Sequence, residues 1–369
     1  MSEINLPDIP LEEFEVPQEE FRSEAGIKNK YEGSIEYGVI GSGQCGGRLA
    51  KSFFDIGYKK ALAINTAEAD LIPLELPKNQ KMLIGDFQGS GKSMIRGAQA
   101  ASNSSQRILD MMRLIFGNVK KIIISVGFGG GTGAGSLSIL IDLAAKYLED
   151  IGISNPHKNV IVVAALPTIG ELKTPITAKN NAEIKRDMFM RSKENKIGPI
   201  ILIDNSRIEK LYRGIPPAKF WSTVNDTITG MFQMFNYLSK QESNFTTFDS
   251  EDYNAVISKS GIAVMGATKI SDNDKNETLS QALQDNFKKT LLCSDVDYSS
   301  AKEAACVVVA DNVVMSEGSM DTINYGFDAV HNLIGTANLH RGLYGANTKG
   351  IRAYTLITGM NPVKVDEIA

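Results

Sequence analysis

A glycine-rich stretch at residues 127–136 has the composition of a phosphate-binding turn. It holds six glycines and the hydroxyl side chains of Thr132 and Ser136. Glycines let backbone N–H groups approach and converge on an anion, and hydroxyls add donors. A β-branched run at 122–126 and an apolar-periodic run at 137–148 flank the stretch, so we expect strand, turn and helix N-terminus. A glycine-rich turn that only allows tight packing is equally compatible with the pattern.

A second glycine loop has the spacing of a dinucleotide fingerprint. Gly41, Gly43 and Gly46 read G-x-G-x-x-G after a short predicted strand. In dinucleotide-binding domains an acidic residue about 20 residues further on binds the ribose. Here the second predicted strand, residues 61–64, is followed by Asn65 instead. A dinucleotide-dependent oxidoreductase therefore stays open as an alternative, and the missing acid counts against it.

A third loop, residues 89–93, ends in Gly91-Lys92-Ser93, as a Walker A phosphate loop does. The full Walker motif, G-x-x-x-x-G-K-S, also needs a glycine five positions before Gly91. In this chain that position holds Asp86. We therefore do not interpret this loop as a Walker motif, although its glycines and Lys92 are suited to contact a phosphate.

Paired carboxylates occur later, in the sequence Asp249-Ser250-Glu251-Asp252. Carboxylates can order or deprotonate a water that attacks a phosphate, which is the role of such groups in phosphoryl transfer. The same sequence is typical of a helix N-cap followed by acidic first-turn residues. Both interpretations are open from the residues alone.

The elements that would position these residues indicate an α/β protein. Near-continuous apolar runs at 160–167 and 199–203 predict parallel strands buried on both faces. We predict a Rossmann-like parallel-sheet domain, a long central helix and a second, C-terminal α/β domain. The expected boundaries are an acidic N-terminal arm at 1–36, the nucleotide-binding domain at 37–216, the central helix at 217–243, the C-terminal domain at 244–360 and a short tail at 361–369.

The N-terminal arm differs from the rest of the chain. Residues 1–20 hold seven acids, three prolines and no Lys or Arg. This composition favours an extended segment. Its spaced apolar residues would allow it to pack on a neighbouring subunit, and a solvated tail is the alternative.

Overall composition excludes several classes of function. The net charge of −4 lacks the excess of basic residues that is typical of nucleic-acid-binding proteins, and no apolar run is long enough to span a membrane. We therefore expect no direct binding to nucleic acid or to a membrane. Three widely spaced cysteines argue for a reducing cytoplasm and against a disulfide framework or zinc site. The three histidines have no metal-ligand spacing, so each is predicted to be structural or on the surface, and no protein metal site is expected.

Residues 129–135, which read G-G-G-T-G-A-G, match the tubulin signature. At this point the chain resembles the tubulin/FtsZ superfamily of GTP-dependent, filament-forming proteins, and matching stretches follow in order over about residues 35–360. The resemblance implies GTP/GDP and Mg²⁺ as cofactors and a head-to-tail homopolymer. The short tail resembles the prokaryotic, archaeal or phage branch (CetZ-like, TubZ/PhuZ-like or FtsZ-like), with FtsZ proper less favoured.

The resemblance also implies which residues bind the nucleotide. Phosphates, including the γ-phosphate, would be contacted from the glycine loops by Gly43, Gly89, Ser90, Gly91, Lys92, Gly129, Gly130, Gly131, Thr132 and Gly133. Gln44 and Cys45 of the first loop would lie near phosphate and base. Asn65 belongs to a second matching loop, and Glu171 occupies the place of a glutamate that binds ribose. Guanine would be read by Asn205, Trp221 and Asn225. A helix cap at Asn205 and a core position for Trp221 are the alternatives.

For catalysis the resemblance implies that Asp249 and Asp252 act on the nucleotide of the next subunit, so that hydrolysis requires assembly. Two departures from FtsZ are Pro175, near an expected arginine, and Thr247, in place of an asparagine. The expected protein is a cytoplasmic GTPase of the cytoskeleton, working in cell division, cell shape or DNA or phage positioning through an unknown adaptor. A nucleotide-binding scaffold of the same fold that does not hydrolyse GTP is the alternative.

Overall fold

The computed structural model describes residues 33–85, 88–212, 214–270, 279–289, 296–311, 315–316, 320–346 and 350–362. Most of the predicted N-terminal arm, residues 1–32, and most of the predicted tail, residues 363–369, lie outside the described residues. The interpretation of the arm as a contact with a neighbouring subunit therefore stays a prediction.

The strands of the described residues join in a single mixed sheet. They are β1 (Tyr37–Ser42), β2 (Ala61–Asn65), β3 (Lys81–Leu83), β4 (Lys121–Gly127), β5 (Val160–Leu166), β6 (Pro199–Asp204), β7 (Gly261–Ile270), β8 (Val296–Asp297), β9 (Glu303–Asp311), β10 (Asn338–Ala346) and β11 (Ile351–Pro362). Their order across the sheet is β10-β9-β11-β7-β6-β5-β4-β1-β2-β3, and β8 pairs with β11.

Helices surround this sheet. The α-helices are α2 (Gly43–Asp55), α3 (Glu68–Leu71), α4 (Met94–Asn103), α5 (Ser105–Phe116), α6 (Thr132–Asp150), α7 (Ile169–Leu172), α8 (Pro175–Lys193), α9 (Asn205–Leu211), α10 (Pro217–Leu238), α11 (Ser250–Ile257), α12 (Leu279–Lys289) and α14 (Met320–Ile334). Short 3-10 turns occupy η2 (Lys78–Gln80), η3 (Pro156–Asn159) and η4 (Tyr298–Ser300).

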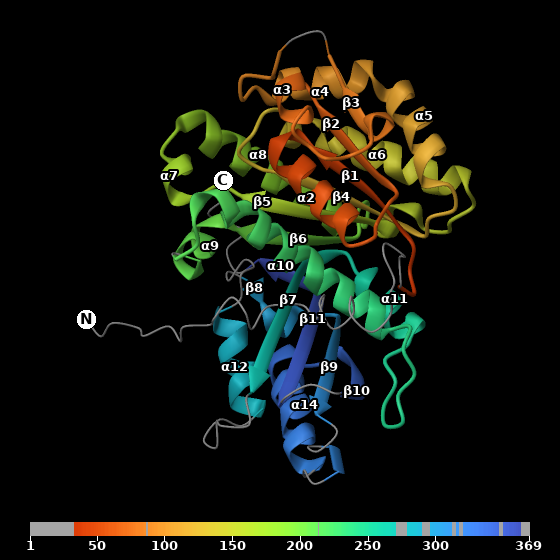
Figure 1. Ribbon diagram of the computed structural model, residues 1–369, viewed down its shortest axis with the longest axis vertical. Coiled ribbons are helices and arrows are strands. Elements are labelled where there is room, and N and C mark those ends of the chain that lie inside the picture. Colours follow the sequence, from red (N-terminus) through yellow and green to blue (C-terminus); the bar gives the residue numbers. More distant parts are fainter. Residues whose placement is uncertain are drawn as a thin grey trace.

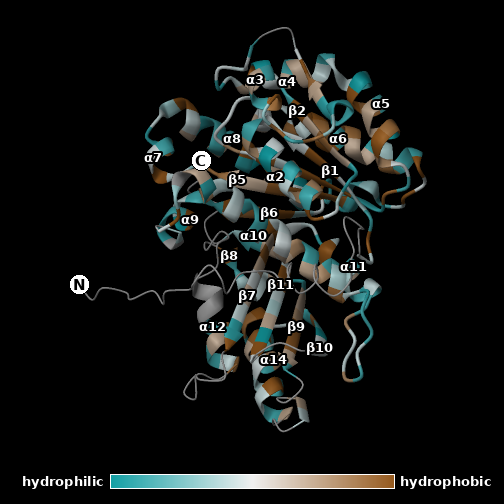
Figure 2. Cartoon of the chain, in the orientation of Figure 1, coloured by the Kyte–Doolittle hydropathy of each residue, from teal (hydrophilic) through white to brown (hydrophobic). Residues whose placement is uncertain are grey.

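The first half of the sheet, from β3 to β6, is entirely parallel. Figure 1 shows α2 in front of these strands and α6 behind them. Because both faces are covered, the central strands are mostly apolar, and Ile122, Ile123 and Ile124 of β4 are completely buried. Figure 2 shows hydrophobic residues gathered along the central strands and hydrophilic residues over much of the surrounding helices. The predicted α/β class and parallel sheet are confirmed.

The long helix α10 lies between the two halves of the molecule (Figure 1). It packs against α2 on one side and against α11 and β7 on the other. Phe53 of α2 meets Phe232 of α10 in a T-shaped contact with ring centroids 5.6 Å apart. Such a pair stabilises the packing by about 0.5–1.5 kcal/mol beyond the buried area. The predicted central helix is confirmed.

The second half of the sheet is mixed. β7 begins parallel to β6 and then runs antiparallel to β11, which is antiparallel to β9, while β9 and β10 are parallel. Helices α12 and α14 pack on each other and on β7 and β9. This is the predicted second α/β unit, although its exact boundaries stay a prediction.

Two expected helices have different limits in the structure. The sequence pattern predicts a single helix over residues 95–116, but α4 ends at Asn103 and α5 begins at Ser105. The hydroxyl of Ser105 donates to the carbonyls of Ala101 and Ser102, and this competition with backbone hydrogen bonds accounts for the break. The helix after the signature begins at Thr132, five residues earlier than the apolar pattern indicates.

Candidate functional site

The glycine loops meet at one edge of the parallel sheet. β1, β4, β5 and β6 are neighbours and run in the same direction, so their carboxyl ends share this edge. Residues 43–45, 128–131, 167–171 and 205 follow those ends directly. In open α/β sheets, ligands bind outside the carboxyl ends of the strands. The structure thus brings together the loops that the sequence analysis assigned to the nucleotide.

The signature glycines are required by packing as well as suited to a ligand. A Cβ on Gly131 would lie 2.4 Å from Ser90 Oγ and 2.6 Å from the backbone of Lys92 and Ser93. A Cβ on Gly133 would lie 2.9 Å from the Ser42 carbonyl oxygen. Gly130, in contrast, faces open space, with its nearest neighbour at 3.9 Å. Packing therefore explains the glycines at Gly131 and Gly133. The side of the turn at Gly130 is open.

Hydroxyl groups cross-link the loops beneath the open side. Thr132 Oγ1 lies 2.7 Å from Thr66 Oγ1 and donates to Ser90 Oγ at 3.2 Å, and all three residues are buried. Ser42 and Ser136 are joined in the same way at 2.7 Å. The N-terminus of α6, with its positive dipole end, is thereby held against the loop at 89–93. Two predicted site residues, Ser90 and Thr132, are in direct contact.

The predicted residues Gln44 and Asn65 are joined through Asp70. Gln44 Nε2 and Asn65 Nδ2 each donate to one carboxylate oxygen of Asp70 at 3.1 Å. Asn65 Oδ1 also accepts from the backbone N–H groups of Thr66 and Ala67. The Asn65 side chain thus shapes its own loop, and Asp70, which the sequence analysis did not assign to the site, links two predicted site residues.

Lys92 is fixed above the signature turn by α8. Its backbone has φ = 63°, a left-handed conformation that is uncommon outside glycine, and its Nζ donates to Thr177 Oγ1 at 3.1 Å. Buried Asn180 donates to the Lys92 carbonyl oxygen at 2.8 Å and lies 3.4 Å from those of Gly129 and Gly130. Asn180 was not singled out from the sequence, where its polar side chain within a helical pattern was the only signal.

Cys45 and Glu171 lie within electrostatic range of each other at the first loop. Burial raises the pKa of the Cys45 thiol to about 11, with smaller contributions from Arg48, which lowers it, and Glu171, which raises it. A thiol with a raised pKa stays neutral and unreactive at physiological pH. Glu171 forms a capping box with Thr168 at the start of α7. Both side chains are thus placed at the edge of the sheet where a ligand could meet them.

The three residues assigned to the base lie on α9 and α10. Asn205 is the first residue of α9, and Asp204, not Asn205, caps that helix by accepting from the N–H groups of Ser206 and Arg207. Trp221 is 39% exposed and meets Phe220 edge-on, so a core position for this tryptophan is wrong. Asn225 is half-buried one helical turn further on.

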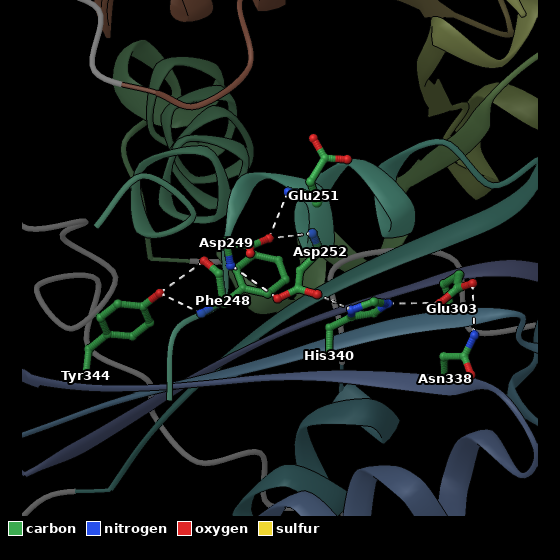
Figure 3. A network of polar contacts seen from close by, with 8 residues as sticks. All are labelled: Phe248, Asp249, Glu251, Asp252, Glu303, Asn338, His340 and Tyr344. Atoms are coloured by element: carbon green, nitrogen blue, oxygen red, sulfur yellow. Dashed lines mark hydrogen bonds and ion pairs between the residues drawn. The ribbon is translucent and has the colours of Figure 1, made fainter. Parts of the chain in front are cut away.

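The acidic turn is a helix cap in the structure. Asp249 Oδ1 accepts from the N–H groups of Glu251 and Asp252, and Asp252 Oδ2 accepts from the N–H of Asp249 (Figure 3). These contacts form a capping box at the start of α11. The capping interpretation is therefore confirmed, and the catalytic role stays a prediction, since a capping carboxylate keeps further lone pairs for other partners.

The acidic turn lies at the edge of the sheet opposite to the glycine loops. Tyr253 of α11 accepts a hydrogen bond from Tyr37, the first residue of β1. Ser258, just after α11, accepts from Lys121, the first residue of β4, and Ser260 donates to the carbonyl of Ile197, just before β6. α11 therefore packs at the amino ends of the parallel strands, and one chain does not bring its predicted acids to its own predicted nucleotide site.

Lys121, which helps to anchor this edge, is a buried lysine. Its side chain is 1% exposed, its Nζ donates to Asn159 and Ser258, and burial lowers its pKa to about 7. The unfolded chain, with an ordinary lysine pKa of about 10.4, binds more protons than the folded chain between these two values. Folding stability is therefore expected to rise as pH increases from about 7 to about 10.

Replacing Lys121 with methionine should increase the free energy of unfolding near pH 7 by roughly 2–4 kcal/mol and flatten its rise toward about pH 10, since one pKa unit corresponds to about 1.4 kcal/mol. Urea unfolding at both pH values measures the effect. Lys120→Met removes an exposed lysine next to it and serves as the control. A loss of stability of equal size at both pH values in Lys121→Met would contradict the burial argument.

The described residues include no group of three or more His, Cys, Asp or Glu side chains placed to hold a metal ion. Within the same residues no helix is long and apolar enough to cross a membrane.

No family model matches the chain. Its sequence is 26% identical over 337 residues to the tubulin-like protein CetZ of Pyrococcus abyssi, covering 87% of this chain and 85% of that protein. It is 25% identical over 340 residues to the cell division protein FtsZ 2 of Halobacterium salinarum, covering 89% and 77%. Among solved structures, a GTPγS-form protofilament of TubZ from Bacillus thuringiensis serovar israelensis superposes with a TM-score of 0.78 at 18% identity, covering 90% of this chain and 88% of that one.

The relatives, the mixed sheet and the glycine-rich edge agree on one class of protein. The chain is similar in sequence to members of the tubulin/FtsZ superfamily and has their two-domain α/β fold. The resemblance to this superfamily that the sequence motifs predict is confirmed. The assignment of individual site residues stays a prediction.

Proposed function

We propose that the protein binds and hydrolyses GTP and polymerises head-to-tail, the acidic turn of one subunit completing the GTP site of the next. The observation that carries this proposal is the placement of the two predicted half-sites at opposite edges of one parallel sheet. β4 alone separates those edges by about 20 Å, at about 3.3 Å per residue. One subunit cannot close such a site, but a second subunit stacked on the glycine edge can. A contact of this heterologous kind, repeated without closure, builds a filament.

The known relatives support this proposal. The TubZ structure is described as a GTPγS-form protofilament, so a chain of the same fold assembles with a guanine nucleotide analogue. The relatives named CetZ and FtsZ are described as a tubulin-like protein and a cell division protein. A role in cell division, cell shape or DNA positioning, a cytoplasmic location and an unidentified adaptor belong to the same proposal.

In this mechanism the amides at the turn before α6 hold the phosphates, and the Ser90 and Thr132 hydroxyls keep the two phosphate loops together. Trp221 stacks on the guanine, and Asn205 and Asn225 bond its edge. A Mg²⁺ ion would sit mainly on phosphate oxygens and water, as it commonly does, since no acidic cage exists among the described residues. When bound, it neutralises phosphate charge. Asp249 and Asp252 of the next subunit orient or deprotonate the attacking water.

One observation favours a second candidate, a filament scaffold that binds the nucleotide without hydrolysing it. Both aspartates already serve as helix caps, so their presence does not require catalysis. The dinucleotide-dependent oxidoreductase has no support among the relatives and the structure named above.

GTP turnover measured against protein concentration tests the proposal. Because each active site needs two subunits, turnover should be near zero below a threshold concentration and rise steeply above it, together with the amount of sedimenting polymer. Turnover proportional to concentration from the lowest values would exclude a shared site. Polymer without turnover would favour the scaffold.

A further inference from the structure

One face of strand β10 contacts the acidic turn through three of its residues, His340, Gly342 and Tyr344. Alternate residues of a strand point to the same side, so Asn338, His340, Gly342 and Tyr344 share this face. Figure 3 shows the last and second of these residues, Tyr344 and His340, reaching the two ends of the turn at residues 248–252. The position of the turn thus depends on a strand about 90 residues later in the chain.

Tyr344 and Gly342 hold the start of the turn. The Tyr344 hydroxyl accepts from the N–H of Phe248 at 3.0 Å and lies 3.1 Å from the carbonyl oxygen of the same residue. A Cβ on Gly342 would lie 2.9 Å from Phe248 Cβ, so only glycine leaves room for this approach. The backbone of Phe248, the residue before Asp249, is therefore held in place by β10.

His340 holds the end of the turn. Its Nδ1 lies 2.7 Å from Asp252 Oδ1, and its Nε2 lies 3.0 Å from Glu303 Oε2 (Figure 3). The side chain of Glu303 is 8% exposed, that of His340 20% and that of Asp252 32%. The three groups thus form a line from the protein interior toward the surface on which Asp252 lies.

Glu303 is a firm anchor for this line. Its other oxygen, Oε1, accepts from Lys259 Nζ at 3.0 Å and from Asn338 Nδ2 at 3.2 Å. Burial on its own would raise the pKa of Glu303, but hydrogen bonds from Lys259, His340 and Asn338 outweigh it and hold that pKa below its usual value. Glu303 is therefore ionised at neutral pH.

The two contacts of His340 determine how many protons its ring must carry. A carboxylate is only an acceptor, and a neutral imidazole has only one N–H, so a histidine bonded to two carboxylates needs protons on both ring nitrogens. The charged groups that contact the ring are Asp252 on α11 and Glu303 on β9, and Lys259 before β7 pairs with Glu303.

We propose that His340 is a positioning residue for Asp252, its ring holding that carboxylate in one orientation while Glu303 anchors the ring from the other side. This inference rests on the proposed GTPase function. It predicts that Asp252, which would act on the GTP of the next subunit, is held in place by His340 and Glu303 of its own subunit. A ring with only one N–H could donate to only one of the two carboxylates.

The test uses the full chain with His340→Ala, His340→Gln and Glu303→Gln, and with His331→Gln as control, since His331 is exposed on α14. The readout is GTP turnover per sedimented subunit. His340→Ala should lower it roughly ten- to hundredfold, the usual effect of removing a residue that orients a functional group. GTP affinity of the monomer should stay unchanged. His340→Gln, which keeps one donor, should recover part of the loss.

Rescue by the conservative variant distinguishes positioning from simple packing. A turnover in His340→Ala equal to that of the wild type, or no recovery of turnover in His340→Gln, would overturn the proposal. Absence of assembly-dependent turnover in the wild type would instead refute the proposed function.

A measurement without turnover keeps the inference testable in that case. The chain has three histidines, so ¹⁵N-histidine spectra are assigned by their loss in His340→Gln. The His340 ring should show two protonated nitrogens near neutral pH, and both Asp252→Asn and Glu303→Gln should shift its signals while leaving His157 and His331 unchanged. His340 signals that are unchanged in both variants would contradict the proposed bridge from Asp252 through His340 to Glu303.

Discussion

Asp252→Ala is expected to lower GTP turnover per polymerised subunit by about a hundredfold or more, the usual contribution of a general base. Nucleotide binding should be unchanged, because Asp252 lies at the sheet edge opposite to the glycine loops. The variant also loses one half of a capping box, which costs about 1 kcal/mol of stability. Asp252→Asn keeps an oxygen acceptor for the Asp249 N–H and separates the loss of basicity from the loss of the cap.

The matched control is Glu251→Ala. Glu251 is an exposed acid in the same helical turn, and its backbone N–H rather than its carboxylate contacts Asp249. Its removal changes the local charge equally and should leave turnover within about twofold, as expected for an exposed group that contributes little. GTP hydrolysis assayed on pelleted polymer compares the three variants. Wild-type turnover in both Asp252 variants would remove this residue from the mechanism.

Gly131→Ala is expected to weaken GTP binding about tenfold or more. The added Cβ would meet Ser90 Oγ at 2.4 Å and the backbone of Lys92 and Ser93 at 2.6 Å. Backbone cannot move aside as a flexible side chain does, and overpacking of this kind costs about 1–3 kcal/mol. Each 1.4 kcal/mol or so lost from binding is a tenfold change in Kd. The loop at 89–93 would separate from the N-terminus of α6, and the two would no longer converge on one phosphate chain.

Gly130→Ala provides the comparison, one residue earlier in the same turn. Its Cβ would find open space, so the packing of the loops and the thermal midpoint should match the wild type. Titration calorimetry with GTP, together with thermal unfolding, measures both variants. Equal affinity of Gly131→Ala and wild type for GTP would show that contact between these loops is not needed for binding.

Much of the fold was predictable because it depends on local features. Three consecutive isoleucines at 122–124 indicate a strand buried on both faces, and the structure confirms it. The long helix from Pro217 was also predicted correctly. The break at Ser104 was missed, since serine hydroxyls compete with helix hydrogen bonds without interrupting the apolar periodicity.

The candidate site was only partly predictable, because its contacts join residues far apart in the chain. Asn180 contacts the carbonyl of Lys92 and Asp70 joins Gln44 to Asn65, yet no local pattern marks either residue. His340, interpreted from sequence as structural or on the surface, lies between two acids. Such partners are selected by which elements pack together.

By itself, the sequence determined the α/β class, the order of most strands, loops and helices, and the resemblance to the tubulin/FtsZ superfamily. Hydrophobic period and glycine spacing are local properties that survive in the folded chain. Only the tertiary structure decided that Trp221 is exposed and that Gly131 is a packing contact while Gly130 is open. It also decided that the glycine loops and the acidic turn lie at opposite ends of the same parallel strands. The physical reason is direction: parallel strands collect their carboxyl ends at one edge and their amino ends at the other, and α11 packs at the second.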